Sequence, residues 1–203
     1  MSYDDSRMSE NDKLELEPPI LLLAMPQVVD PFFHKSVVLL VHHQDEGSLG
    51  FIVNRPTNVA VGDILDGLEI TWNGDREQAV HFGGPVQPQL GTVIYRSETP
   101  EATESQQIIY DGVLMTQNIK DLASMAEKPP VLLRLFLGYA GWGDGQLMRE
   151  ILRNDWLMAP VDTDLVFGDP PEEVWDRALR SVGVDPAQLP TWTSDGSDDL
   201  PAN

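Results

Sequence analysis

Cysteine is absent from the 203 residues of this sequence. Its absence excludes disulfide bonds, zinc sites built from thiolates and cysteine nucleophiles. No apolar run is long enough to cross a bilayer as a helix. The first five residues are acidic and polar, unlike a secretory signal or a basic transit peptide. These features favour a cytoplasmic protein that does not associate with membranes.

Basic residues are few: 13 lysines and arginines stand against 33 aspartates and glutamates, for a formal net charge of -20. Proteins that bind nucleic acids rely on lysine and arginine to neutralise phosphates. In this chain those residues are scattered singly, so direct nucleic-acid binding is disfavoured. The simplest role for so much negative charge is solubility.

The usual catalytic motifs are also missing. The chain has no Gly-x-Ser-x-Gly, no Walker or Rossmann glycine pattern and no paired-carboxylate signature. Its four histidines, at positions 34, 42, 43 and 81, are not at spacings typical of metal ligands. The sequence therefore predicts neither a metal site nor a cofactor.

The composition indicates one folded domain between two tails. Hydrophobic residues make up 41% of the chain, as in ordinary soluble domains. Residues 1–18 and 190–203 are acidic and lack any repeating apolar face, which predicts disordered tails. The single domain is expected to span residues 19–189.

The most informative stretch runs from residue 131 to residue 152. The apolar run 131–137 lies between Pro130 and Gly138 and predicts a buried strand. Leu147, Ile151 and Leu152 have the spacing of a helix face. The glycine-rich segment 141–145 between them predicts a loop, with Asp144 as the helix cap and a bound ligand as the less favoured alternative.

The rest of the chain alternates short strands with a few helices, which argues for an α+β fold. Strands are expected over 20–24, 36–43, 49–53, 79–82, 92–96, 107–110 and 113–116, and helices over 61–68, 118–127 and 171–182. A tight return at Gly47 predicts a hairpin, and residues 54–57 are expected to end its second strand. Trp175 lies at the centre of an apolar helix face and is expected in the core.

Dispersed motifs give the chain a specific resemblance to a known family. They are Ala24-Met25-Pro26, Asp30-Pro31-Phe32-Phe33 with Ser36-Val37, His43 before Gly47 and Gly50, Asn54-Arg55-Pro56, Gly83-Gly84-Pro85-Val86, residues 138–143, Gly145-Gln146-Leu147, Glu150 and Trp156. In this order, from about Leu21 to Gly183, they resemble the AlgH/YqgE family of small bacterial proteins. Met148 departs from the family, which usually has a glutamate there, whereas Glu150 matches it.

The resemblance has consequences for fold and function. It implies a mixed, largely antiparallel, bifurcated sheet that forms a pseudo-barrel with flanking helices. The family's name suggests transcriptional regulation, and the resemblance itself implies no mechanism.

The motifs predict one surface groove rich in backbone turns and hydrogen-bonding side chains. Its candidate ligand-binding residues are His43, Asn54, Arg55, Gly83, Gly84, Gly141, Trp142, Gln146 and Glu150. Within this groove, Arg55 would receive an anion or form an internal ion pair. His43 would lie near the rim, as a hydrogen-bonded histidine or a general base. The two adjacent glycines would form a wall or simply a sharp turn.

Three functional hypotheses follow from these residues. The first is a non-enzymatic regulatory or adaptor protein that binds a protein partner or a small ligand in the groove. The second is a hydrolase-like enzyme for an anionic small molecule, with His43 as base and Arg55 as anion clamp. The third and least supported is a DNA-binding transcriptional regulator, because the chain lacks a basic reading element.

Overall fold

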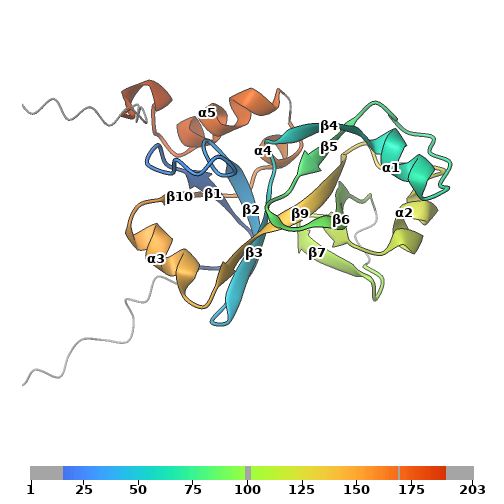
Figure 1. Cartoon of the computed structure of the whole chain (residues 1–203), viewed down its shortest axis with the longest axis horizontal. Helices are drawn as coiled ribbons and strands as arrows, with labels where there is room; N and C mark the ends of the chain where they lie inside the picture. The colour runs from blue at the N-terminus through green and yellow to red at the C-terminus, as the bar shows by residue number, and fades with distance from the viewer. Residues whose placement is uncertain (1–15, 99–101, 169, 191–203) are drawn as a thin grey trace, which may run out of the picture.

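Ten strands form one connected, curled sheet in a computed structural model that describes residues 16–98, 102–168 and 170–190 (Figure 1). The strands are β1 (Ile20–Ala24), β2 (Val37–Gln44), β3 (Gly47–Ile52), β4 (Pro56–Ala60), β5 (Ala79–Phe82), β6 (Val86–Arg96), β7 (Gln106–Tyr110), β8 (Val113–Thr116), β9 (Leu133–Gly143) and β10 (Trp156–Ala159). The helices are α1 (Val61–Gly67), α2 (Ile119–Met125), α3 (Gln146–Leu152), α4 (Thr163–Val166) and α5 (Pro171–Ser181), with a 3₁₀ turn at Pro186–Gln188.

The long strand β9 joins the two halves of the sheet. Its last residues pair antiparallel with β3, which continues through β2 and β1 to β10. Its first residues pair antiparallel with β6, which continues through β8 to β7, and parallel with β5. All other strand pairs are antiparallel. The predicted α+β class and the bifurcated, barrel-like sheet are therefore confirmed.

The predicted end of the central strand is wrong. The strand begins at Leu133, with Val131 almost fully exposed before it, and it continues through the glycines to Gly143. Gly141 and Gly143 are paired with Leu49 and Gly47 of β3, so the partner strand keeps this glycine-rich segment extended. Sequence periodicity carries no signal for such pairing.

The start of α3 also differs from the expectation. The residue before the helix is Gly145, which adopts a left-handed φ of 59°, and Asp144 is not the cap. Instead, the backbone N–H of Gly143 donates to Oε1 of Gln146 at 3.1 Å. The Gln146 side chain thus ties the end of β9 to the first residue of the helix, and no side chain caps the helix itself.

Two further boundaries differ. The break at Asn54 and Arg55 lasts only a few residues, because β4 begins at Pro56 and pairs with β5. The strand predicted to start at residue 92 already begins at Val86, since β6 follows β9 along its length. In both places tertiary pairing extends a strand whose own sequence does not alternate.

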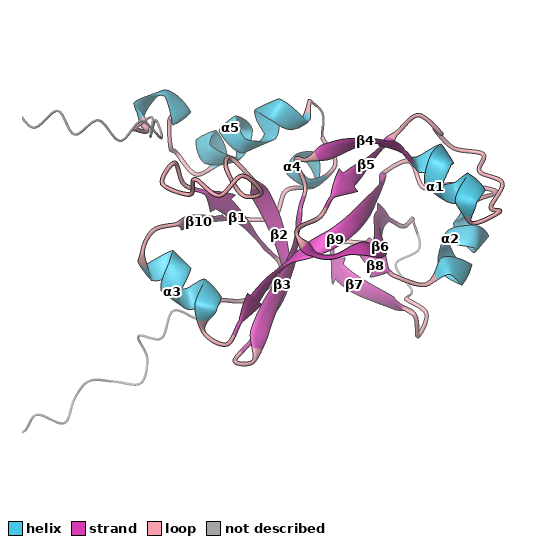
Figure 2. Cartoon of the chain, viewed as in Figure 1, coloured by secondary structure: helices cyan, strands magenta, loops and turns pink. Residues whose placement is uncertain are grey.

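Helices cover the sheet on different sides and close the core (Figure 2). Trp175 of α5 is 4% exposed, and its indole N–H donates to the carbonyl of Ala24 at 2.8 Å, so its predicted core position is confirmed. Leu147 and Ile151 of α3 are buried in a separate cluster with Trp142 and Trp156. Among the described helices, none is long and apolar enough to span a membrane.

One residue of the predicted N-terminal tail packs against the folded domain. Leu16, assigned to the tail, is 7% exposed and belongs to the same apolar cluster as Trp142, Leu147 and Ile151. The only apolar residues near Leu16 in this acidic stretch are too few to predict a buried face, so its burial was not predictable from local pattern. Of the predicted tails, residues 1–15 and 191–203 lie outside the described residues.

Candidate functional site

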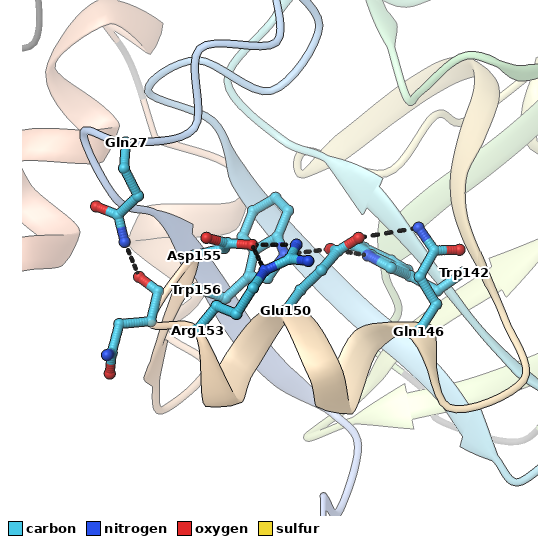
Figure 3. Close-up of polar contacts among 8 residues, drawn as sticks. Gln27, Trp142, Gln146, Glu150, Arg153, Asp155 and Trp156 are labelled. Atoms are coloured by element: carbon cyan, nitrogen blue, oxygen red, sulfur yellow. Dashed lines mark hydrogen bonds and ion pairs between the residues drawn. The ribbon is translucent and has the colours of Figure 1, made fainter.

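One carboxylate, that of Glu150 on α3, collects three hydrogen bonds (Figure 3). The indole N–H groups of Trp142 and Trp156 each donate to its Oε2 at 2.8 Å. The side-chain amide of Gln146, one helical turn earlier, donates to its Oε1 at 2.9 Å. Glu150 therefore links the end of β9, the start of β10 and α3, and its orientation is fixed.

This cluster lines an open pocket of about 470 Å³, here called the α3 pocket. Its walls are Gln27, Val28, Val29, Asp30, Phe33, Gly141, Trp142, Gln146, Glu150, Arg153, Asp155 and Trp156. Three acids and one arginine carry the charges, and Arg153 pairs with Asp155 at 2.6 Å. The pocket thus combines negative charge with aromatic surface.

Aromatic rings form the floor of the α3 pocket. The rings of Trp142 and Trp156 meet edge to face with centroids 5.8 Å apart. Phe33, from the loop between β1 and β2, packs edge to face on Trp156 at 5.8 Å and lies 6.4 Å from Trp142. Such contacts hold rings in definite orientations, so the floor is a preformed surface.

Asn54 and Arg55 anchor the loop that carries Phe33. The Asn54 amide is buried, donates to the carbonyl of Lys35 at 2.9 Å and accepts from the backbone N–H of Val37 at 2.9 Å. The Arg55 guanidinium donates to the carbonyls of His34 and Asn54. Burial lowers the pKa of Arg55. Both residues therefore act on the shape of the α3 pocket through the loop, without lining it.

His43 lies on the same face of the sheet as Trp142. His43 of β2 pairs across strands with Ser48 of β3, and Ser48 pairs with Trp142 of β9. Directly opposite residues in neighbouring strands share a face. His43 Nδ1 and Ser48 Oγ are 2.7 Å apart, and Ser48 is 8% exposed. The histidine is thus half-buried and hydrogen-bonded.

Gly83 and Gly84 contact the backbone of β9. The N–H of Gly83 donates to the carbonyl of Leu137 at 2.9 Å, and its carbonyl accepts from Ile52 at 2.9 Å. A Cβ on Gly84, whose φ is 151°, would lie 2.2 Å from the carbonyl carbon of Tyr139. Only glycine allows this approach, so the pair has a clear structural role.

A buried polar cluster at the start of β9 was not predicted. Arg134 is 3% exposed and donates to the carbonyls of Val53 at 2.6 Å and Gly168 at 2.9 Å. It also lies 2.7 Å from Nε2 of His81. Burial, and then the Arg134 charge, lower the pKa of His81 to about 4, so the imidazole is neutral and accepts. The single charged residue within an apolar run was the available signal.

The nine candidate residues therefore divide into groups, unlike the single groove that was expected. Gly141, Trp142, Gln146 and Glu150 line the α3 pocket. His43 is hydrogen-bonded to Ser48, which pairs with the pocket residue Trp142. Asn54 and Arg55 anchor the loop that carries Phe33, and Gly83 and Gly84 pack on β9. Sequence reasoning missed the role of Trp156, although that residue was among the family motifs. Among the residues that the structure describes, no three His, Asp or Glu side chains are placed to share a metal ion.

Comparisons with known proteins agree on one family. A family model described as AlgH-like matches residues 21–187. A UPF0301 protein of Myxococcus xanthus is 39% identical over 172 residues, covering 84% of this chain and 93% of that protein. A UPF0301 protein of Xylella fastidiosa is 40% identical over 176 residues, covering 85% and 93%.

Two solved structures are similar as well. The solution structure of the AlgH protein from Pseudomonas aeruginosa has a TM-score of 0.69 and 32% identity, covering 84% of this chain and 93% of that one. The crystal structure of a Corynebacterium diphtheriae protein has a TM-score of 0.70 and 26% identity, covering 82% and 87%. The fold described above is thus shared with proteins from distant bacteria.

Proposed function

The chain belongs to the AlgH-like family, and we propose that it is a non-enzymatic binding protein, a regulator or adaptor, that recognises its partner or ligand at the α3 pocket. The proposal rests on one observation: the Glu150 carboxylate is held by two indole N–H groups at the floor of an open, aromatic pocket. A preformed pocket with a few fixed polar groups is the usual form of a ligand site.

The charges of the pocket define what it would bind. Asp30, Glu150 and Asp155 all line the pocket, and Arg153 is the only basic residue among its lining residues. A ligand that donates hydrogen bonds or carries positive charge gains from this field, whereas an anion is repelled. In the proposed function the partner therefore presents an amine, amide or guanidinium group to the pocket. The absence of cysteine fits a cytoplasmic setting for this interaction.

Intrinsic fluorescence tests the proposal, because two of the five tryptophans line the pocket. Full-length protein is screened against amines, nucleosides, basic peptides and a lysate fraction, with thermal shift as a second readout. A true ligand changes the Trp142 and Trp156 emission and raises Tm by mass action. Glu150→Gln removes the charge, keeps the size, and should weaken binding about tenfold or more.

Glu173→Gln is the matched control, since Glu173 is exposed on α5 and the substitution makes the same charge change. Its affinity should equal that of the wild type. Ligands whose binding is insensitive to Glu150→Gln and Trp142→Phe would show that the α3 pocket is only a structural joint between α3 and the sheet.

A second candidate function, a hydrolase, is favoured by the 2.7 Å separation of His43 Nδ1 and Ser48 Oγ. A serine within hydrogen-bond reach of an imidazole is the minimal arrangement of nucleophile and base. Arg55, bound to main-chain carbonyls, would position the loop here and would not clamp the substrate. Covalent labelling by a fluorophosphonate that disappears in Ser48→Ala and His43→Gln, while both variants keep the wild-type Tm, would establish this function. No labelling of the wild type would remove it.

A further inference from the structure

A second pocket lies between the β1–β2 loop and α5. It has a volume of about 420 Å³ and is here called the α5 pocket. Its lining residues are Pro26, His34, Lys35, Trp175, Asp176, Arg180, Pro186, Ala187, Leu189 and Pro190. Figure 1 shows this loop beside α5 and the C-terminal turn.

The charge of the α5 pocket is opposite to that of the whole protein. Lys35 and Arg180 line it together with His34, and Asp176 is the single acid among the lining residues. The chain as a whole has 33 acids and 13 bases. Long-range repulsion therefore works against any anion, so an anion that binds here must be held by local groups.

The two loop residues that line this pocket, His34 and Lys35, are held in place by hydrogen bonds to their carbonyls. Asn54 donates to the carbonyl of Lys35 at 2.9 Å, and Arg55 donates to the carbonyl of His34. Lys35 itself has a left-handed φ of 51°, an uncommon conformation for a lysine. Such backbone conformations persist where surrounding contacts enforce them, and they gather at binding sites.

The cationic groups stand beside apolar surface. The Lys35 ammonium lies 5.2 Å from the centroid of the Trp175 ring, within the range of a cation–π contact. Pro26, Pro186 and Leu189 add flat or aliphatic walls. Arg180 contacts Asp176 only loosely, at 3.6 Å, and its side chain is 61% exposed, so its guanidinium can turn towards a ligand.

We propose that the α5 pocket binds small anions in which a phosphate or carboxylate is attached to a flat, apolar group. The oxyanion accepts two hydrogen bonds from Arg180 and is attracted by the ammonium group of Lys35. The flat group packs on Pro26 and Leu189. In this arrangement the Asn54-Arg55 motif is a positioning element for an anion site that Lys35 and Arg180 provide. The site is independent of the function proposed for the α3 pocket.

The test is a titration of the full-length protein, followed by amide and indole NMR signals at physiological salt. Phenyl phosphate and benzoate are the two oxyanion probes, and benzyl alcohol is the neutral one. Saturable shifts are expected at Lys35, Arg180 and the Trp175 indole N–H with at least one oxyanion and none with benzyl alcohol. The tighter of the two probes identifies the ligand as a phosphate or a carboxylate.

Charge-removing variants locate the site. Lys35→Gln and Arg180→Gln should each weaken the better probe about tenfold, the usual effect of losing one charge-assisted hydrogen bond. Lys120→Gln on α2 and Arg149→Gln on α3 make the same charge changes on exposed surface elsewhere and should leave affinity within about twofold. Absence of saturable shifts with both oxyanions, or equal losses in the control variants, overturns the proposal.

Discussion

Each end of β9 lies beside a charged group that is out of full contact with water, a cation at its start and an anion at its end. At its start, the Arg134 cation is buried among carbonyl oxygens and a neutral histidine. At its end, Trp142 meets the half-buried Glu150 anion, which accepts from indole and amide donors. Dipolar groups stabilise the charge at both ends.

The difference lies in access. Arg134 is hydrogen-bonded to Val53 just after β3, to His81 of β5 and to Gly168, so its hydrogen bonds hold separate parts of the core together. Glu150 lines an open pocket and remains within reach of a ligand. A buried charge with a full set of acceptors therefore serves stability, whereas a charged group at a pocket wall can also serve recognition.

Removing the buried cation should have the largest effect. Arg134→Leu leaves the carbonyls of Val53 and Gly168 and Nε2 of His81 without this donor inside the core. The expected loss of unfolding free energy is about 3–5 kcal/mol, measured by urea denaturation. A loss below about 1 kcal/mol would mean that the two ends of β9 do not differ in the way described.

The His81 imidazole should make stability depend on pH. Its pKa falls from 6.5 to about 4 on folding, so between these values the unfolded chain binds a proton that the folded chain does not. The contribution is complete above pH 6.5, declines as the pH falls, and is lost below about pH 4, a difference of about 3 kcal/mol.

The control for this prediction is His81→Gln, which cannot titrate. The free energy of unfolding of the wild type should decrease more steeply from pH 7 to pH 4 than that of the variant. Parallel curves for the two proteins would show that folding does not lower the pKa of His81.

Truncation probes the Glu150 end of β9. A chain that starts at Leu16 should keep the wild-type stability of its core, because Leu16 completes the cluster with Trp142 and Leu147. A chain that starts at Pro19 should lose about 2 kcal/mol, the usual cost of exposing one buried leucine. Chemical denaturation gives the free energy of unfolding of each truncated chain, and equal values would contradict the role given to Leu16.

The smallest effect is expected at the pocket itself. Trp142→Phe removes one of the three donors to Glu150 and keeps most of the aromatic packing, so it should cost about 1 kcal/mol. Thermal denaturation measures the loss. A cost as large as that of Arg134→Leu would make the Glu150 cluster a core element and weaken its proposed role in binding.

Sequence patterns predicted the parts of the fold that local periodicity determines. The hairpin at Gly47 and the helix α5 with its buried Trp175 are both present. The extension of β9 to Gly143 was not predictable, because it depends on pairing with β3, far away in sequence. Long-range pairing leaves no periodic signal in either strand.

The candidate site was predictable only in part for the same reason. Trp142, Gln146 and Glu150 are close in sequence and were found together. Trp156 and Phe33 reach the pocket because β10 pairs with β1 and the β1–β2 loop folds over the sheet. The partners of Asn54 and Arg55 are main-chain carbonyls of that loop, which side-chain chemistry alone does not reveal.

The membership of β9 in both halves of the sheet also governs how the chain can fold. Neither half is complete without β9, whose partners β3 and β6 begin at Gly47 and Val86. Contacts between residues so far apart in sequence form slowly, because the entropy of closing a long loop is lost before the contacts stabilise the chain. Synthesis on the ribosome therefore yields no finished half until β9 has begun to emerge, and the two halves should unfold together in a single cooperative transition.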